Sequence, residues 1–309
     1  MAIVASKRGT LAVEKRDIHQ AVTDRIIASI EAGTAPWMKP WTSQGPTVRP
    51  LRSTGQAYNG VNVLTLWLDA EEKGYSSPYW FGFQTALKMN ACVRKGEKGS
   101  AIVYANKLIK TEENPTTGEE ESRAIPFLKQ SYVFNAAQID GLPEHFYETA
   151  TPPPDRTPKA RDSRLDDFFR HTGVDLRHGG SRAFYRVDAD FVQMPNFEDF
   201  HTGENYYSTL AHEMTHWTRH PLRLDRDMGR KAWGDAGYAM EELVAEMGAA
   251  FLCADLGITP ETRDDHAAYI AAWLEVLKND KRAIFTAASK ASQAAEYLQT
   301  LAMPMEVAA

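Results

Sequence analysis

Apolar side chains near the start of the chain recur at helical spacing. In residues 16–33, isoleucine and valine return every three or four positions, and the pattern stops at Gly33. Such spacing predicts an amphipathic helix that ends at a glycine cap. Residues 62–74 follow the same pattern and stop at Gly74, which predicts a second helix.

The next pattern is that of paired strands. Residues 100–110 and 124–139 are rich in β-branched and aromatic residues, and each predicts a strand. The segment between them, residues 111–123, is rich in glutamate and contains glycine, so we expect a mobile hairpin loop. The mixture of helices and strands predicts an α+β fold for this half of the chain.

Four prolines fall within residues 151–158 and divide the chain. Proline neither continues a helix nor pairs in a central strand, so this segment is predicted to be an extended linker. We therefore expect one domain in residues 1–150 and another in residues 159–309. The elements predicted in the second domain are a short helix over residues 164–173, strands within residues 182–195 and helices from Tyr206 onward. That order is expected of a small, metalloprotease-like α+β domain.

Composition narrows the class of protein. Of the 309 residues, 43% are hydrophobic and 25% are charged, which is normal for a soluble globular protein. The first residues lack the apolar stretch and cleavage site of a signal peptide, and no later run has the roughly 18 apolar residues of a membrane span. We therefore expect a cytoplasmic protein without membrane contact. Cys92 and Cys253 lie far apart and indicate neither a disulfide framework nor a cysteine-based zinc site.

Charge is distributed unevenly about a net value of -6. Residues 1–150 hold 17 Lys and Arg against 16 Asp and Glu, and five of those acids lie in residues 111–123. Residues 151–309 hold 18 basic residues against 25 acidic ones. The first half is therefore mildly basic outside its acidic segment, whereas the second half is acidic.

The stretch STLAHEMTHWTRH, residues 208–220, contains the pattern His-Glu-x-x-His. On a helix, His212 and His216 project from one face one turn apart, so both imidazoles can reach the same metal ion. Glu213 projects roughly 60 to 100° away from them, which suits a general base better than a ligand. The predicted chemistry is hydrolysis: the ion lowers the pKa of its bound water, Glu213 accepts the proton, and the hydroxide attacks a peptide carbonyl.

A catalytic zinc ion needs a third protein ligand. The helix-forming run of residues 238–257 offers Glu242 and Glu246 on one face with the small Ala249, whereas Glu241 is expected to point elsewhere. We predict that Glu242 completes the metal site and that Glu246 orients a ligating histidine, with Glu246 as the alternative ligand. The competing interpretation is that these glutamates form a solvated helix face.

His220 and Tyr238 are further candidates close to these patterns in the sequence. Either side chain could polarise a substrate carbonyl. The alternative for each is an ordinary packing or surface role, and the sequence leaves this choice open.

The first domain concentrates aromatic and basic residues in places that helical cores do not require. Flat rings beside cations suit single-stranded nucleic acid, because bases stack on the rings and phosphates pair with the charges. Any single ring is better explained as core, but the ensemble favours nucleic-acid binding. The predicted contacts are Trp37, Trp41, Arg49, Arg52, Tyr58, Asn59, Tyr79, Trp80, Lys95 and Lys98.

Several motifs resemble those of ArdC-type antirestriction proteins. They are IIASIEAGTAPWMKPW, STGQAYNGVNVLTLWL, VRKGEKG and VFNAAQIDGLP in the first domain, and HEMTHWTRHPLRLDR and EELVAEMGAAFL in the second. The resemblance covers nearly the whole chain. It implies a first domain that binds single-stranded DNA non-specifically and a second domain with a zincin-like, Spartan-type metalloprotease fold. It also implies a protein of plasmids or other mobile elements that protects incoming DNA from host restriction.

Carried over by position, the metal-site motif of that family matches His212, Glu213, His216 and Glu242. The expected cofactor is Zn²⁺, with Mn²⁺ or another divalent transition metal as the alternative. The expected partners are single-stranded DNA and, as a peptidase substrate, a host restriction protein or another DNA-bound protein. Two other functions stay open: a DNA-coating protein whose metal is purely structural, and a cytoplasmic metalloprotease whose first domain recognises protein.

Overall fold

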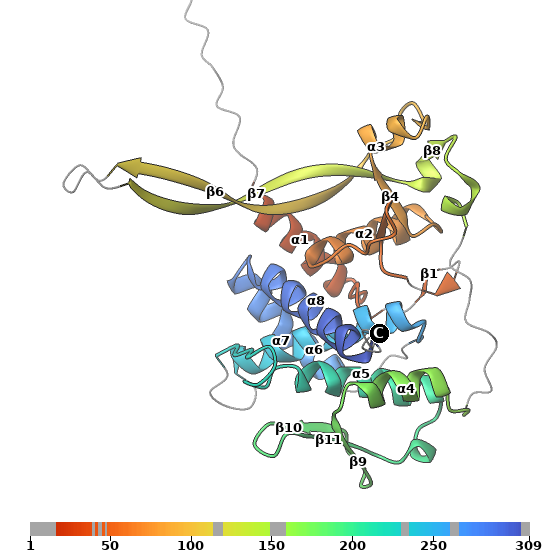
Figure 1. The fold of residues 1–309 in the computed structure, drawn as a ribbon, viewed down its shortest axis with the longest axis vertical. Coiled ribbons are helices and arrows are strands. Elements are labelled where there is room, and N and C mark those ends of the chain that lie inside the picture. Colours follow the sequence, from red (N-terminus) through yellow and green to blue (C-terminus); the bar gives the residue numbers. More distant parts are fainter. Residues whose placement is uncertain are drawn as a thin grey trace, which may run out of the picture.

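The computed structural model describes residues 17–38, 41–42, 45–46, 48–113, 120–148, 159–229, 235–259 and 266–303. We refer to the described residues up to 148 as the N-terminal part and to those from 159 onward as the C-terminal part. The proline-rich segment 151–158, predicted to be a linker, lies outside the described residues. Figure 1 shows the N-terminal part, in red to yellow-green, above the C-terminal part, in green to blue.

The N-terminal part combines helices with a four-stranded sheet. The strand order is β3-β4-β7-β6, with β3 parallel to β4 and the other neighbours antiparallel. Two further strand pairs, β1 with β2 and β5 with β8, lie outside this sheet. The elements are α1 (Ile18–Glu31), β1 (Trp41–Thr42), β2 (Gly45–Pro46), β3 (Leu51–Arg52), α2 (Val61–Lys73), β4 (Tyr79–Gly82), α3 (Phe83–Lys88), β5 (Cys92–Val93), β6 (Ser100–Glu113), β7 (Glu120–Asn135) and β8 (Ile139–Asp140).

Helices α1 and α2 form where the apolar pattern predicts them. The side chain of Asp17 accepts a hydrogen bond of 3.2 Å from the backbone N–H of Gln20 and so caps the start of α1. Helix α2 ends at Gly74, whose φ of 69° is the left-handed conformation that glycine adopts most easily. Both features follow from the local sequence.

Strands β6 and β7 form a long hairpin that projects sideways from the molecule (Figure 1). The register pairs Ser100 with Val133 at the base of the hairpin and continues without interruption along both strands. The hairpin was predicted, but the strands extend into the acidic segment that we expected to be a loop, since residues 111–113 and 120–123 are paired. Strand pairing here persists although glutamates lie opposite one another, an arrangement that like charges oppose.

The C-terminal part packs a three-stranded sheet against helices. In the strand order β10-β11-β9, β11 is antiparallel to β10 and parallel to β9. Helix α5 contacts both β10 and β11 on one side and α6 and α8 on the other. The elements are α4 (Ser163–His171), β9 (Asp175–His178), β10 (Phe184–Arg186), β11 (Phe191–Met194), α5 (Gly203–Trp217), α6 (Ala236–Leu256), α7 (His266–Asn279) and α8 (Ala283–Ala302).

The helices predicted for this part are present, and so are the strands β10 and β11. Strand β9 was not predicted, because its sequence Asp-Leu-Arg-His carries a single apolar side chain and mostly faces solvent. The α+β fold with two parts is confirmed. Within the described ranges, no helix is long and apolar enough to cross a membrane.

One apolar core connects the two parts. The ring of Trp37, which follows α1, meets that of Trp273 in α7 edge-on, with ring centroids 6.0 Å apart. Arg49 donates from Nε to Asp255 near the end of α6 over 2.7 Å. The backbone N–H of Gly60 donates to the side chain of a serine in α8. Helix α6, which carries the glutamates of the predicted metal site, is therefore in direct contact with the N-terminal part.

Candidate metal centre

The two histidines of the His-Glu-x-x-His pattern lie in α5, between the three-stranded sheet and α6. The helix starts at Thr202, whose side chain accepts a hydrogen bond of 3.1 Å from the backbone N–H of Asn205. One turn separates His212 from His216, and their Nε2 atoms lie 3.2 Å apart. Their side chains are 6% and 12% exposed, so both imidazoles are largely removed from water.

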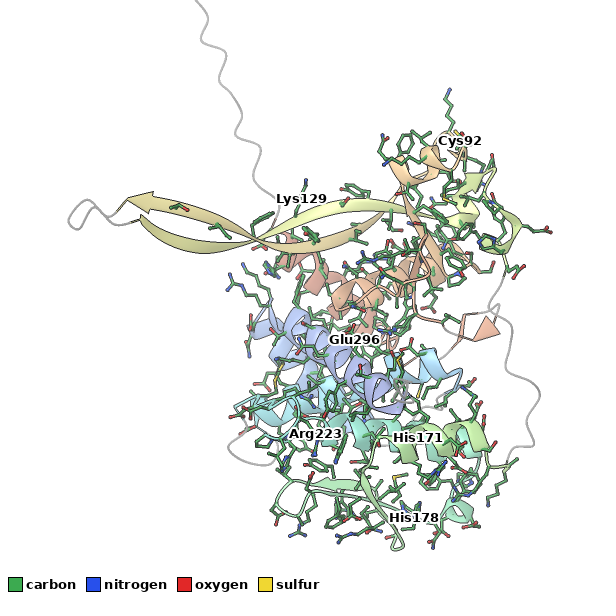
Figure 2. All side chains as sticks on the ribbon, viewed as in Figure 1. Cys92, Lys129, His171, His178, Arg223 and Glu296 are labelled. Carbon is green, nitrogen blue, oxygen red and sulfur yellow. The ribbon has the colours of Figure 1, made fainter. Side chains whose placement is uncertain are left out.

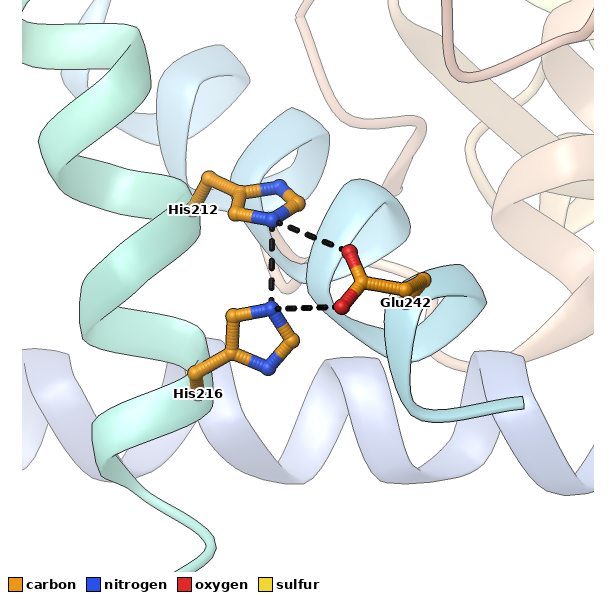
Figure 3. Close-up of side chains that lie close together, drawn as sticks. All are labelled: His212, His216 and Glu242. Carbon is orange, nitrogen blue, oxygen red and sulfur yellow. Dashed lines mark hydrogen bonds and ion pairs between the residues drawn. The ribbon is translucent and has the colours of Figure 1, made fainter. Parts of the chain in front are cut away.

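Helix α6 brings Glu242 to this pair, as Figure 3 shows. Its Oε2 lies 3.6 Å from His212 Nε2, and its Oε1 lies 3.5 Å from His216 Nε2. Ligand atoms held about 2.0–2.1 Å from a tetrahedral ion lie about 3.4 Å from one another. The spacings in this cluster are therefore those of ligands around one small ion. Two imidazoles and one carboxylate are also a donor set of zinc-dependent hydrolases.

The close crossing of α5 and α6 depends on Gly248. A Cβ atom at this position would lie 2.5 Å from Thr215 Cγ2, which is closer than van der Waals contact allows. Thr215 itself is fixed, because its hydroxyl donates a hydrogen bond of 2.9 Å to the carbonyl of Ala211. The absence of a side chain at Gly248 thus lets α6 approach α5 closely enough for Glu242 to reach the histidines.

Two more of the predicted glutamates lie beside this cluster. Glu246 follows Glu242 by one turn of α6, and its Oε1 lies 3.3 Å from Nδ1 of His212. This nitrogen is on the opposite side of the ring from the Nε2 atom that faces the cluster. Glu213 follows His212 directly in α5 and is 5% exposed.

Glu241 was expected to point away from the site, and this expectation is wrong. Its Oε1 lies 3.1 Å from Nδ1 of His216, and its side chain is 2% exposed. The direction in which a side chain leaves the helix does not show that an imidazole carries nitrogens at two different edges of its ring. His216 therefore contacts two consecutive residues of α6, with Nε2 towards Glu242 and Nδ1 towards Glu241.

Arg226 was not found by sequence analysis. This arginine lies in the segment after α5 and pairs with Glu241 in the interior. Its distance along the chain from the histidine pattern does not indicate a role at the metal site. The one sequence signal for Arg226 is its position at the end of the stretch HEMTHWTRHPLRLDR, which also contains the histidines.

The charges in the cluster stabilise one another. Burial alone would lower the pKa of His216, but the carboxylates of Glu242 and Glu241 outweigh it and raise this pKa to about 10. Burial alone would raise the pKa of Glu241, but hydrogen bonds from Arg226 and His216 lower it to about 2. The pKa of Glu242 is likewise lowered by the two histidines against the effect of burial. Glu241 and Glu242 are therefore carboxylates at neutral pH.

Of the two further candidates, Tyr238 interacts with Glu242 of the cluster, whereas His220 lies outside α5. The hydroxyls of Tyr238 and Tyr269 lie 3.1 Å apart, and burial followed by these contacts and by Glu242 raises the pKa of Tyr238. Tyr238 therefore remains a neutral phenol that can donate a hydrogen bond near Glu242. His220 lies beyond the end of α5, where its Nδ1 accepts a hydrogen bond of 3.2 Å from the backbone N–H of Leu222.

The structure corrects four of the predicted nucleic-acid contacts. Trp37, Tyr58 and Trp80 are 4%, 5% and 2% exposed and belong to the apolar core, so they present no free ring face to a base. Arg49 is also buried, and its guanidinium is paired with Asp255. A sequence pattern does not reveal which side of a ring another part of the chain covers, and this is why the prediction failed.

The other predicted contacts are at least partly accessible where they are described. Tyr79 is half-buried, with its ring against Phe146. The side chain of Trp41 lies outside the described part of the structure. The exposed residues are Arg52, Asn59, Lys95 and Lys98.

The hairpin exposes aromatic rings that were predicted only as parts of strands. Tyr104 and Tyr132 are each 56% exposed and Phe127 is 40% exposed. The exposed Lys129 lies directly opposite Tyr104 in the register, and Phe127 is two residues from Lys129, so these three share one face. Figure 2 shows Lys129 on the side of the hairpin that faces away from the C-terminal part. The alternation of side chains along a strand shows which residues share a face, but it does not show which face is covered by the rest of the protein.

Comparison with known families agrees with the geometry of the cluster. Residues 163–290 match the family model of the zincin-like metallopeptidases. The match and the histidine–glutamate cluster between α5 and α6 together define the C-terminal part as a zincin-like metallopeptidase domain.

Residues 16–134 match the family model of the N-terminal domain of the anti-restriction factor ArdC. The metal-free crystal structure of the antirestriction protein ArdC from plasmid R388 is 49% identical to this chain and superimposes with a TM-score of 0.80, covering 93% of this chain and 98% of that one. The chain therefore belongs to the ArdC family of antirestriction proteins, as its motifs predicted. The Mn(II)-bound structure of the same R388 protein is 47% identical, with a TM-score of 0.77 over 94% of this chain and all of that one.

Two further relatives extend the comparison. The uncharacterised protein y4eC of Sinorhizobium fredii is 41% identical over 290 residues, which are 91% of each chain. A DNA primase TraC of Escherichia coli is 35% identical over 93% of this chain, but the match spans only 27% of the primase. The ArdC-like unit thus also occurs as one portion of a longer protein.

Proposed function

We propose that this antirestriction protein carries a metal-dependent peptidase centre in which His212, His216 and Glu242 hold one divalent ion. The observation that carries the proposal is the convergence of three side chains between α5 and α6, with both histidine Nε2 atoms and both Glu242 oxygens at nearest spacings of 3.2 to 3.6 Å. Zn²⁺ fits this set of two nitrogens and one oxygen. Mn²⁺, which is bound in a structure of the R388 relative, is the alternative ion.

A divalent ion at this site supplies Lewis acidity toward a water molecule and a peptide carbonyl. Glu213 lies next to His212 in α5 and is buried, so its carboxylate can accept a proton from the attacking water and pass it to the leaving amine. Glu246 Oε1 lies 3.3 Å from Nδ1 of His212, and a hydrogen bond from this nitrogen would leave Nε2 of that ring free to act as a ligand. Tyr238 can donate its phenol proton to a developing oxyanion.

The metal site and the hydrolysis can be tested separately. In Glu213→Gln we expect full metal content with hydrolysis of a protein substrate reduced by about 10² to 10⁴, because only the proton acceptor is lost. In His212→Ala we expect loss of both. Metal content is measured by inductively coupled plasma mass spectrometry and hydrolysis by cleavage of DNA-bound test proteins. Wild-type activity in Glu213→Gln would refute the role of this glutamate.

We further propose that single-stranded DNA binds the face of the β6–β7 hairpin formed by Tyr104, Phe127 and Lys129, which we call the hairpin face. Exposed rings beside a cation allow bases to stack while a phosphate pairs with the charge. The exposed Arg52, Lys95 and Lys98 of the same N-terminal part would extend this basic surface.

Substitution of the rings tests the hairpin face. Because each base–ring stack is worth about 1–3 kcal/mol, Tyr104→Ala with Phe127→Ala should weaken binding of a fluorescent oligothymidine by at least about tenfold at fixed salt. Phe184→Ala, which removes a ring of 37% exposure from the C-terminal part, is the control and should bind normally. Unchanged affinity in the double variant would exclude the hairpin face, and equal affinity for duplex DNA would exclude stacking as the cause.

The biological role follows from combining the two sites. We propose that the protein protects DNA entering a restricting host, with its peptidase centre acting on a restriction protein or another DNA-bound protein. Transfer efficiency into a restricting host should then fall in Glu213→Gln and in the hairpin double variant. Full protection by Glu213→Gln and by His212→Ala would instead favour a DNA-coating protein whose metal is structural. Failure of the purified wild type to bind any oligonucleotide would favour a protease that recognises protein.

A further inference from the structure

We infer that Glu241 and Arg226 are positioning residues for the metal centre: Glu241 fixes the ring of His216 so that its Nε2 is the metal-binding atom, and Arg226 fixes Glu241. This inference rests on the proposed metal site. It extends that site beyond the three ligands and Glu213 to a buried pair that the sequence motifs did not mark.

The contacts of His216 define what Glu241 does. The Nδ1 atom of this ring lies 3.1 Å from Oε1 of Glu241, while Nε2 lies 3.2 Å from Nε2 of His212 and 3.5 Å from Oε1 of Glu242. Metal binding requires the neutral form of the ring, in which one nitrogen carries a hydrogen and the other a lone pair. Donation of Nδ1–H to Glu241 therefore assigns the lone pair to Nε2, the atom that faces the other two ligands.

Arg226 fixes the carboxylate in turn. It donates from Nε to Oε2 of Glu241 over 2.9 Å and from Nη2 to Oε1 over 2.8 Å, a bidentate pair. The same guanidinium donates to the carbonyl of Thr215 over 2.8 Å and to Oγ1 of Thr218 over 3.0 Å. Arg226 thus connects the carboxylate from α6 to the last turn of α5, which carries His216.

Arg226 and Glu241 are buried, so each depends on the other as a hydrogen-bonding partner. The side chains of Arg226 and Glu241 are 1% and 2% exposed, so neither has water to replace a lost partner. Buried ion pairs seldom stabilise a protein more than well-packed apolar residues would. Glu241 also contacts Nδ1 of His216, the ring nitrogen that does not face the other ligands. An ion pair with a purely structural role would not require this contact. His212 has the corresponding contact with Glu246, but from a carboxylate that is 11% exposed.

The test compares metal affinity in full-length variants. We expect Glu241→Gln to weaken Zn²⁺ binding by about 10- to 100-fold, the range typical of groups that orient a ligating histidine, because an amide can stabilise either tautomer of His216. Arg226→Lys keeps the charge but loses the two-point contact, so its dissociation constant should lie between those of the wild type and Glu241→Gln. Dissociation constants are measured by competition with a chromophoric chelator.

Two further measurements separate positioning from general stability. Asp190→Asn removes the negative charge and one of the two acceptors that pair with Arg223, another arginine of the segment after α5, and should lower the unfolding temperature without changing zinc affinity. Nitrogen-15 spectra of the histidines in the zinc-loaded protein should report one tautomer of His216 in the wild type and two in Glu241→Gln.

Zinc affinity of Glu241→Gln within twofold of the wild type would overturn the inference, as would an equal loss of affinity in Asp190→Asn. If Glu241→Gln does not fold, unchanged affinity in Arg226→Lys together with a mixed tautomer in the wild type would overturn it. A wild-type protein that binds no divalent ion would overturn the proposed metal site itself, which is a different result from equal binding by wild type and variant.

Discussion

Each imidazole of the histidine pair has a carboxylate at the nitrogen that faces away from the cluster. Glu246 lies 3.3 Å from His212 and Glu241 lies 3.1 Å from His216, each measured at Nδ1. Such contacts fix ring orientation and increase the basicity of the opposite nitrogen. The geometry of the metal cluster therefore depends on five side chains, namely the two histidines, Glu241, Glu242 and Glu246.

We predict how the stability of the metal-free protein depends on the protonation of Glu241. The pKa of Glu241 is about 2 in the folded state, against an ordinary value of 4.5, because hydrogen bonds from Arg226 and His216 outweigh burial. A lowered folded pKa stabilises the fold above pH 4.5, and this contribution is lost as the pH falls towards 2. Urea unfolding with chelator present should show a steeper loss of stability across this window in the wild type than in Glu241→Gln. Parallel profiles would contradict the prediction.

At the scale of elements, the site exists because α5 and α6 cross closely. Helical spacing places His212 and His216 on one face, and the same spacing places Glu242 and Glu246 together on the other helix. Neither helix alone holds a metal ion. The distance between the helices is set where Gly248 meets Thr215.

We predict that Gly248→Ala disturbs this crossing. The added Cβ would lie 2.5 Å from Thr215 Cγ2, so the helices must separate or bend. Overpacking of this kind costs about 1–3 kcal/mol, and the shift of Glu242 should also weaken metal binding. Thermal unfolding and metal titration measure the two effects. Thr215→Ser removes Cγ2 and should restore part of both losses in the double variant. No change in unfolding temperature for Gly248→Ala would disprove the tight contact.

At the scale of the whole molecule, the two parts share one core. Trp37 meets Trp273, and Arg49 meets Asp255 in the helix that carries the glutamates of the metal cluster. The domains predicted from the proline-rich segment are therefore not independent bodies joined only by a linker. A structural change in the N-terminal part has a direct route of contacts to α6.

We predict that removal of Trp37 destabilises the C-terminal part as well. Trp37→Ala deletes a ring that is 4% exposed, a change that typically costs about 3–5 kcal/mol. In Trp37→Ala, the unfolding temperature monitored by metal release should therefore fall together with the unfolding temperature monitored by circular dichroism. Phe83→Ala removes a ring that is 47% exposed and serves as the matched control, which should leave both transitions in place. Two separate transitions, with metal release unaffected in Trp37→Ala, would contradict the shared core.

Features that depend on neighbours along the chain could be predicted from the amino-acid pattern. Helical periodicity placed His212 and His216 on one face, and the glycine cap closed α2 at Gly74, because hydrogen bonds and side-chain spacing in a helix are local. The mixture of helix and strand patterns, divided by the proline-rich segment, predicted the two-part α+β fold, and the family motifs added the zincin-like class of the second part. Paired strands were also predicted from the alternating pattern, although not how far they extend.

Which side chains are covered, and which distant residues meet, depends on the packing of the folded chain. It buried Trp37, Tyr58 and Trp80 and left the rings of the β6–β7 hairpin exposed. It also turned Glu241 towards His216 and paired it with Arg226. These outcomes depend on how elements far apart in the sequence pack, and hydrophobicity or spacing within one element carries no record of its partner.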